Sequence, residues 1–398
     1  MMPSFMHRVR MRSAEASGFS AGAAATTVAA VFCLSATPLA AQGSLGSLGF
    51  GYPVGGVSVR TAGTADAFAD FDALSPRNPA AIGGLQRMVL SAQTEPEYRS
   101  LSFNGTQERT TIQRIPLIAV LFPFRRGFAL GLSASSFLDR SYSMLTTGTA
   151  LIEGVPVSTN DRLDIRGAIG DMRAAVGWQI NSRFKIGVGG HLYTGENVAV
   201  RERKFADTLS FGSVLDSSRV NYFGTALSVG GEVRVLKGLA AVGSYRKGNT
   251  FKSRVRDSVR TTADVPDRVG LGLRYDGIAG TTLAVGMEQV KWTNMAALGT
   301  GLSTTHDANN LHAGIEVQGP QFRGSPIFLR AGYARNELPF SVSAERVKET
   351  RFSTGVGLPI ARDAATFDIS VQRANRALAN SGAKESAWLL GFGLQIRP

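Results

Sequence analysis

The sequence has 398 residues, of which 43% are hydrophobic and 46 are glycine, and it carries a formal net charge of +13 with a single cysteine. One cysteine excludes a disulfide framework, and the lack of any run of ~18 consecutive apolar residues beyond residue 41 excludes a membrane-spanning helix there. No RNA- or DNA-binding motif accompanies the basic charge. We therefore expect this charge to attract anionic lipid headgroups or acidic ligands.

The first 41 residues have the pattern of a secretory signal peptide. A short apolar run, Ala23–Leu34, is followed by the sequence TPLAAQG, with the expected cleavage after Ala41. A basic start precedes this run and consists of Arg8, Arg10 and Arg12. Residues 1–41 hold three of the 43 basic and one of the 30 acidic residues, which leaves 40 and 29 in the mature chain, without cysteine. An exported chain without disulfides must be held together by size, packing or a closed hydrogen-bond network.

Residues 42–86 are small and polar, unlike the chain that follows. The part from Thr61 to Ala73 predicts one or two helical turns. Ser75-Pro76 and Asn78-Pro79 interrupt any helix, because the residue before a proline avoids the α region. The side chains expected to pack inward are Ala65, Phe68, Ala69 and Phe71. A segment of this composition does not bury itself alone, so it must pack against the rest of the chain.

From about residue 87, apolar and polar residues alternate. In DRVGLGLRYDG the apolar positions are Val269, Leu271, Leu273 and Tyr275, and arginine or glycine stands between them. The same alternation fills the last strand-like stretch, WLLGFGLQIRP. Strict alternation of this length is typical of strands with one apolar face and one polar face.

The alternation predicts fourteen strands separated by connections of two kinds. The strands lie near 87–95, 115–124, 127–140, 165–180, 183–199, 219–235, 238–254, 263–276, 280–292, 309–318, 325–336, 350–359, 365–374 and 386–397. Six short turns alternate with seven longer, mostly polar connections near 96–114, 141–164, 200–218, 255–262, 293–308, 337–349 and 375–385. This layout indicates an all-β membrane protein, an antiparallel up-and-down transmembrane β-barrel of about 14 strands. A soluble β-sandwich or propeller is the alternative, but sandwich strands are usually shorter, ~5–6 residues, and no blade repeat is present.

The two faces of the predicted strands have separate expected environments. The polar face is rich in glycine and should line the lumen, where small residues leave room. Aromatic residues at strand ends are expected at the two membrane interfaces. Near the short turns they are Phe122, Phe124, Phe128 and Trp178, and at the opposite rim they are Trp292 and Trp388.

A fourteen-stranded barrel has a lumen wide enough to need filling or to conduct water. We therefore expect the segment before the first strand to fold back into the barrel as a plug. The predicted organisation is a signal peptide over 1–41, an N-terminal periplasmic or lumenal plug over 42–86, and the transmembrane barrel over 87–398.

The stretch TAGTADAFADFDALSPRNPAAIGGL resembles the amino-terminal hatch of the outer-membrane long-chain fatty-acid and hydrocarbon transporters. That family has a small-residue stretch, an acidic residue and then Asn-Pro-Ala before strand one. Asn78, Pro79 and Ala80 match the motif, and Asp72 matches the acidic position, with Asp70 as a competing match. The glycine usual directly after the motif is absent. The resemblance implies a plugged fourteen-stranded barrel whose hatch moves to open a path for ligand.

The Asn-Pro-Ala motif has two other interpretations. A related family of secretion-system shuttle barrels also carries an Ala/Gly-rich start followed by Asn-Pro-Ala. Asn78-Pro79 can also serve only as a turn that directs the chain into the first strand. A turn and a gate can use the same residues, so both roles stay open.

Few side chains on the lumen face suggest chemistry. His191 and His312 should face the lumen, and nothing in the sequence brings them together, so no metal site is expected. An outer-membrane phospholipase needs a Ser/His pair with an orienting residue on the outer wall, and this facing therefore predicts no enzyme. Lumenal charges ordinarily pair with one another, but an arginine fork also suits the carboxylate of an amphiphilic ligand. The candidates for ligand binding are Arg274 and Arg330, with Phe328 beside them in an apolar pocket.

The strand pattern, the plug and the family resemblance together imply a hatch-gated barrel in the outer membrane of a Gram-negative (diderm) bacterium, for passive uptake of long-chain fatty acids or hydrocarbons without a cofactor. Ligand is expected to enter among the long loops between strands three and four and between five and six, and to leave by a lateral or downward exit. The expected partners are this ligand, outer-membrane lipid and the barrel assembly machinery, with no nucleic acid and a monomer favoured. The alternative is a non-transporting barrel that acts as a secretion-system accessory or surface interaction protein.

Overall fold

The structure is a computed structural model that describes residues 51–398 except 104–105, 153–154, 207–210, 257, 300–303, 323, 343–344, 361–363 and 379–383. The expected signal peptide, residues 1–41, and the start of the expected plug, residues 42–50, lie outside the described residues. None of the helices in these ranges is both long and apolar enough to cross a membrane.

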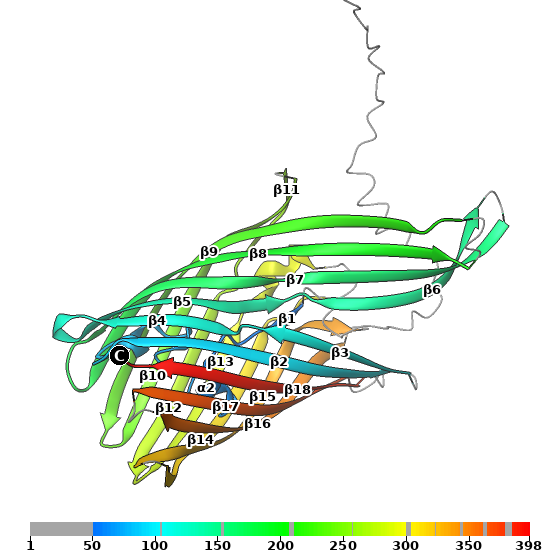
Figure 1. The fold of residues 1–398 in the computed structure, drawn as a ribbon. Coiled ribbons are helices and arrows are strands. Elements are labelled where there is room, and N and C mark those ends of the chain that lie inside the picture. Colours follow the sequence, from blue (N-terminus) through cyan, green and yellow to red (C-terminus); the bar gives the residue numbers. More distant parts are fainter. Residues whose placement is uncertain are drawn as a thin grey trace, which may run out of the picture. The chain divides into compact units, whose positions relative to one another are not determined.

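A single antiparallel sheet of eighteen strands closes on itself (Figure 1). Fourteen strands form the wall of the barrel, and the first and last of them pair from Leu90 opposite Ile396 to Ser102 opposite Lys384. The wall strands are β2 (Val89–Phe103), β4 (Leu117–Pro123), β5 (Phe128–Asp139), β7 (Val155–Gln179), β8 (Phe184–Phe205), β9 (Val214–Leu236), β10 (Leu239–Val255), β12 (Arg268–Ile278), β13 (Thr281–Val290), β14 (Ala308–Phe322), β15 (Ser325–Val342), β16 (Glu345–Ile360), β17 (Ala365–Ala377) and β18 (Lys384–Ile396). The predicted barrel with about 14 strands is confirmed.

The other four strands are short additions to this wall. Strand β1 (Tyr52–Pro53) belongs to the plug and pairs with β5. Strands β3 (Thr106–Arg114), β6 (Tyr142–Ile152) and β11 (Ser258–Asp264) lengthen the wall at the end of the long loops. The short turns lie at the other end, where η3 (Arg125–Gly127) joins β4 to β5. We call these the long-loop end and the short-turn end.

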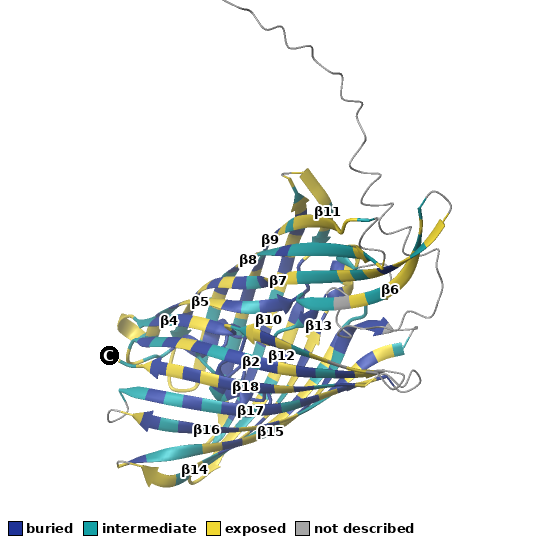
Figure 2. Cartoon of the chain, turned by 45° about the vertical axis from the view of Figure 1, so that its right-hand side comes forward, coloured by how far each residue is buried: buried dark blue, intermediate teal, exposed yellow. Residues whose placement is uncertain are grey.

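The two faces of the wall strands differ in burial, as the alternation predicts (Figure 2). In β12 the apolar side chains of Val269, Leu271 and Leu273 are exposed on the outside, whereas Arg268 is buried in the lumen. The outward face can contact hydrocarbon because the closed sheet leaves its backbone groups paired within the protein. The inward face carries the glycines and charged residues that meet the plug.

Five predicted loops are in fact largely strand in the described residues. Two of them are 255–262, in β10 with β11, and 337–349, in β15 with β16, and the other three are the longest. The stretches 96–114, 141–164 and 200–218 continue as β2 with β3, β6 with β7, and β8 with β9, outside the residues that the structure leaves undescribed. Threonine and valine are frequent there, as in β6 and the start of β7, and β-branched residues favour a pleated backbone even where both faces are polar. Polarity alone was therefore a poor signal for the end of a strand.

The plug occupies residues 51–86 of the described chain, inside the barrel. It contains α2 (Val59–Ala62), whose first turn is capped by the Ser58 side chain, and the single turn η2 (Pro79–Ile82). The four side chains expected to face inward are buried, namely Ala65, Phe68, Ala69 and Phe71. Regular helix is shorter than predicted, because the chain after Ala62 makes successive turns instead.

One predicted interface aromatic lies inside the barrel. Trp292 begins η4 (Trp292–Leu298), which folds over the lumen, and its ring stacks on Phe137 with 5.5 Å between centroids. Trp178 stacks on Phe128 at the short-turn end, and Trp388 is exposed on the outer wall, as expected. The prediction for Trp292 was wrong because the strand β13 ends at Val290. Alternation therefore does not say which way the side chains after Val290 point.

Candidate functional site

The plug contacts the wall through glycines of neighbouring strands. Gly177, Gly187 and Gly230 lie on the consecutive strands β7, β8 and β9 and face the turn from Asn78 to Ile82, which we call the hatch turn. A Cβ at position 187 would lie 2.5 Å from both the Ala80 nitrogen and the Pro79 oxygen. Any larger residue there would displace the hatch turn, so these glycines allow the close approach of two backbones.

The Asn-Pro-Ala motif forms this hatch turn at the short-turn end. Asn78 is fully buried, its Oδ1 accepts from the Ala80 amide at 3.0 Å, and its Nδ2 donates to the Asp70 carbonyl at 2.8 Å. Pro79 occupies the first helical position, where its missing N–H costs nothing. The predicted hatch residues Asn78, Pro79 and Ala80 therefore lie together between the plug and three wall strands.

The two competing aspartates have different contacts. Asp72 stays within the plug, where its Oδ2 accepts from the hydroxyls of Ser58, Thr61 and Ser75 at 2.5, 3.0 and 3.1 Å. Asp70 contacts the wall, because its carboxylate accepts from Arg268 at 3.0 Å. Asp72 thus organises the plug, and Asp70 attaches it to the barrel.

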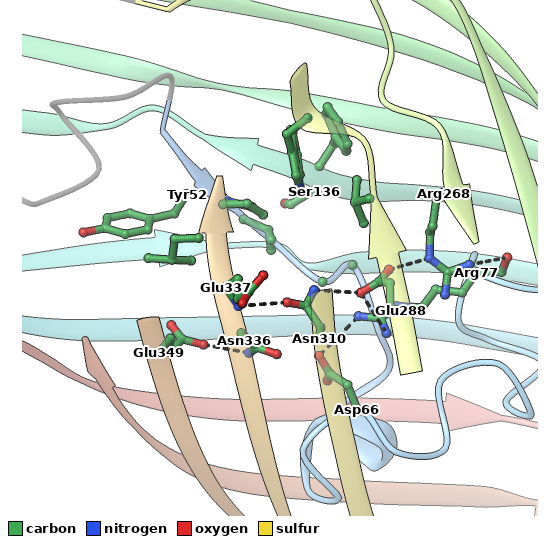
Figure 3. Close-up of a pocket in the computed structure, with 18 of the residues that line it drawn as sticks. Tyr52, Asp66, Arg77, Ser136, Arg268, Glu288, Asn310, Asn336, Glu337 and Glu349 are labelled. Carbon is green, nitrogen blue, oxygen red and sulfur yellow. Dashed lines mark hydrogen bonds and ion pairs between the residues drawn. The ribbon is translucent and has the colours of Figure 1, made fainter. Parts of the chain in front are cut away.

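A continuous chain of alternating charges joins the wall to the plug. Its nitrogen–oxygen distances are 2.7–3.7 Å, apart from a closer contact between Arg268 and Glu288. In order, its members are Asp139, Arg99, Glu97, Arg376, Glu349, Arg351, Asp66, Arg77, Glu288, Arg268 and Asp70. Figure 3 shows Arg77 of the plug beside Glu288 and Arg268 of the wall. Removal of one member takes a buried counterion from each of its neighbours, which is strongly destabilising.

A cavity of about 110 Å³ lies between the plug and the wall, beside this chain of charges. Four buried polar atoms of its lining have no hydrogen-bond partner within the described chain: Asp66 Oδ1, Arg246 Nε, His312 Nε2 and Asn336 Oδ1. The other nitrogen of His312 is 2.9 Å from the Ala65 carbonyl of the plug. The cavity is therefore polar, and its unpaired atoms are suited to water.

The barrel wall has a gap on the long-loop side of Pro116. Strand β4 pairs with β5 up to Leu117 opposite Ser135. Strand β3, which comes just before β4 in the chain, pairs only with β2 among the described residues. Pro116 interrupts the strand because it has no N–H to donate. Beyond this point β1 of the plug is the partner of β5, with Tyr52 opposite Asp139. The plug thus replaces a wall strand at the gap.

Tyr52 fixes β1 in this position. Its hydroxyl donates to both carboxylate oxygens of Glu385 at 2.8 Å. The guanidinium groups of Arg99 and Arg376 lie 4.4 and 4.2 Å from the centre of its ring. Cation–π contacts of this kind add stabilisation when they are desolvated. The gap and Tyr52 were not identified from sequence, although a proline between two alternating stretches was a usable signal.

An aromatic cluster lies on the lumen side of the gap. Phe137 lies at a bulge of β5, and its ring is 4.8 Å from Tyr193 and 5.5 Å from Trp292. The buried rings of the cluster are those of Phe137, Tyr193, Tyr222, Phe251 and Trp292, and they pack with Met295 and smaller apolar side chains. An apolar region therefore adjoins the place where the wall depends on the plug.

The candidate ligand-binding residues lie in two places. Arg330 is buried and donates to Glu316 at 2.7 Å and to Asp368 at 2.6 Å, and its guanidinium is 6.0 Å from the Phe328 ring. Arg274 lies over Phe71 of the plug, with longer ion pairs of 3.8 Å to Glu232 and 3.7 Å to Asp276. Arg330 and Phe328 are thus neighbours, and Arg274 belongs to a separate group. None of the three lines the polar cavity.

Glu316 also holds the plug. It accepts two hydrogen bonds from Arg60 of α2, at 2.6 and 2.9 Å. Partial burial opposes the charge of the Arg60 guanidinium, but the carboxylate of Glu316 outweighs this and raises the pKa of Arg60 above its usual value. The plug is therefore attached to the wall by ion pairs at both Arg60 and Asp70.

The barrel superposes on solved outer-membrane proteins. A Pseudomonas aeruginosa FadL homologue matches 87% of this chain and 99% of its own, with a TM-score of 0.60 and 11% identity. The monoaromatic hydrocarbon channel CymD matches 87% and 98%, with a TM-score of 0.53 and 12% identity. The Pseudomonas putida toluene transporter TodX matches 86% and 98%, with a TM-score of 0.55 and 10% identity.

No family model and no curated protein matches the sequence. The structural similarity extends over most of both chains. Because the sequence identity is low, this similarity establishes the fold and nothing more. The chain therefore has the fold of the FadL-type outer-membrane transporters that its hatch sequence resembles, a fourteen-stranded β-barrel with an N-terminal plug.

Proposed function

We propose that this barrel passes hydrophobic or amphiphilic small molecules across the outer membrane by passive diffusion, and that movement of the plug opens the route. One observation carries the proposal: β1 of the plug is the strand partner of β5 at the gap beyond Pro116. A plug that completes the wall is positioned to open a lateral exit when it withdraws. At the short-turn end, the hatch turn at Asn78-Pro79 closes the lumen by packing against glycines of β7, β8 and β9.

The size of the lumenal cavity supports a plug that moves. Its volume of about 110 Å³ is well below the ~300–1,000 Å³ of typical ligand pockets. It is also smaller than the ~150 Å³ cavity that holds benzene in an engineered protein. A fatty acid or hydrocarbon therefore requires displacement of the plug, of the aromatic cluster, or of both.

The aromatic cluster supports a hydrophobic ligand. Phe137 of this cluster lies on β5 at the gap, so a ligand that displaces its ring reaches the lateral exit directly. The similar structures named above include a hydrocarbon channel and a toluene transporter, which agrees with this class of ligand. Arg274 is the better candidate for binding a carboxylate headgroup, because its ion pairs to wall carboxylates are longer than those of Arg330. Arg330 would have to give up two short ion pairs to bind the same headgroup.

A reversible cross-link between plug and wall tests the proposal. A Cβ at Gly393 of β18 would lie 3.2 Å from the Cβ of Val59, close to the ~3.5–4.5 Å between bridged cysteines. We expect Val59→Cys/Gly393→Cys to block uptake of toluene and of a fluorescent fatty acid when oxidised and to restore it when reduced. Each single cysteine variant is the control. Equal uptake in the oxidised and reduced forms would refute a moving plug.

Small molecules that co-purify with the barrel distinguish transport from an accessory role. We expect mass spectrometry to find a fatty acid or hydrocarbon on the parent protein and less of it on Asn78→Ala and Arg274→Ala. Bulk membrane lipid alone on all forms, together with co-purified exported proteins, would favour the secretion-system accessory.

A further inference from the structure

Three lumenal side chains on adjacent strands form an acid–base–nucleophile arrangement that transport does not require. Nδ1 of His191 on β8 is 3.0 Å from both carboxylate oxygens of Asp171 on β7. Nε2 of the same ring is 2.9 Å from Oγ of Ser228 on β9. A base within hydrogen-bond reach of a nucleophile, itself oriented by a carboxylate, is the arrangement of serine hydrolases, which is recognised by geometry and not by fold.

The pairing of the strands explains how the three side chains meet. His191 lies opposite Arg173 and Ala226, so it reaches diagonally along the sheet to Asp171 on one side and to Ser228 on the other. Ser228 lies opposite Gly189, where a Cβ would come within 2.8 Å of the serine oxygen. Glycine at this position therefore leaves room for Ser228 Oγ to face the histidine. All three side chains are buried, with 3–5% of their surface exposed.

We propose that Ser228, His191 and Asp171 hydrolyse carboxylic esters that enter the lumen. Ser228 Oγ attacks the ester carbonyl carbon while His191 Nε2 accepts the hydroxyl proton, and Asp171 stabilises the imidazolium that forms. The bond from the carbonyl carbon to the alkoxy oxygen then breaks, and His191 returns the proton to the departing alcohol. Water attacks the acyl-serine by the same route, which releases the carboxylic acid and restores Ser228.

The surroundings favour esters with a small apolar acyl group. Tyr193 of the aromatic cluster donates to Asp171 at 3.2 Å and stacks 6.2 Å from the His191 ring, so an apolar region begins beside the histidine. Arg173 is buried directly opposite His191, and its Nε has no hydrogen-bond partner within the described ranges. Its positive charge supplies stabilisation for the oxyanion of the tetrahedral intermediate.

The plug controls access to this serine. Arg173 donates to the Ser75 carbonyl of the plug at 3.4 Å, and Gly230, two residues from Ser228 on the same face, packs against Asn78. The polar cavity reaches Asp171 of the three residues. Displacement of the segment from Ser75 to Asn78 is therefore required before an ester can reach Ser228.

A fluorophosphonate probe tests the proposal, because an activated serine displaces its fluoride and keeps the label. The full-length barrel in detergent is treated as the parent and as Gly187→Ala, which loosens the hatch turn. We expect peptide mass spectrometry to locate the label on Ser228, with labelling about tenfold faster in Gly187→Ala. Hydrolysis of p-nitrophenyl butyrate should likewise be faster in Gly187→Ala than in the parent.

The control separates catalysis from a structural role. Ser228→Ala should abolish both labelling and hydrolysis in the Gly187→Ala background, whereas Ser370→Ala, another buried serine that does not contact the three residues, should retain them. Heat-modifiable gel mobility confirms that each variant is folded. Absence of label on Ser228 in both backgrounds, or equal hydrolysis by Ser228→Ala and Ser370→Ala, would overturn the proposal and reduce the three residues to a structural hydrogen-bond network.

Discussion

Gly187→Ala should shift the plug toward its open position. The added methyl group would lie 2.5 Å from the Ala80 nitrogen and the Pro79 oxygen, where ordinary contacts are 3.4–4 Å. Because both neighbours are backbone atoms, the hatch turn must retreat by about 1 Å. Overpacking of this kind costs ~1–3 kcal/mol, and at ~1.4 kcal/mol per tenfold change this favours the displaced hatch by about 5- to 150-fold.

Planar-bilayer recording is the direct assay, because a displaced hatch turn opens a water-filled path at the short-turn end. We expect Gly187→Ala to conduct for a larger fraction of the time than the parent. The matched control is Gly190→Ala on the same strand, where a Cβ would meet no atom within 4 Å. Identical open fractions for the two variants would refute the view that contact between glycine and backbone holds the hatch turn in place.

Three further substitutions test the attachment of the plug. Arg268→Ala removes the guanidinium shared by the buried carboxylates of Asp70 and Glu288. We therefore expect the free energy of unfolding, measured in urea, to fall by ~3–5 kcal/mol, and an unchanged urea midpoint would contradict this. Tyr52→Ala removes the contacts that hold β1, and limited proteolysis should cleave the plug several-fold faster than in Tyr52→Phe, which keeps the ring. Asn78→Ala loses two buried hydrogen bonds worth ~1 kcal/mol each, so amide exchange in the hatch turn should accelerate by about tenfold or more, unless those bonds contribute nothing.

The alternation in the sequence predicts the wall well, because a residue and its second neighbour must face the same side of a strand. It therefore identifies His191 and Arg330 as lumenal. It does not reveal the stagger of one strand against the next, which decides the height of each side chain along the barrel. For that reason the contact of His191 with Asp171 and Ser228 was not foreseen, although every one of these side chains has the facing that its strand predicts.

The hatch motif was informative for a different reason. Asn78 and Pro79 act through local geometry, since a side-chain cap and a fixed φ angle are properties of a few adjacent residues. The gap at Pro116 depends instead on which strand accepts β5 as a partner, and no local pattern specifies a partner taken from the plug. Arg274 and Arg330 remain proposals for ligand binding, and the structure adds the carboxylates that already contact them.

The replacement of a wall strand by β1 has a consequence for how tightly any ligand can bind. Withdrawal of β1 breaks its pairing with β5, including the 2.9 Å hydrogen bond from the Val54 amide to the Phe137 carbonyl. Two or three backbone hydrogen bonds at ~1 kcal/mol each hold the open form to about 0.7–4% of molecules. The apparent affinity for a ligand that binds only the open form is then weaker than its intrinsic affinity by the inverse of that fraction, about 30- to 140-fold. A ligand held this loosely is also released readily, which favours passage over storage.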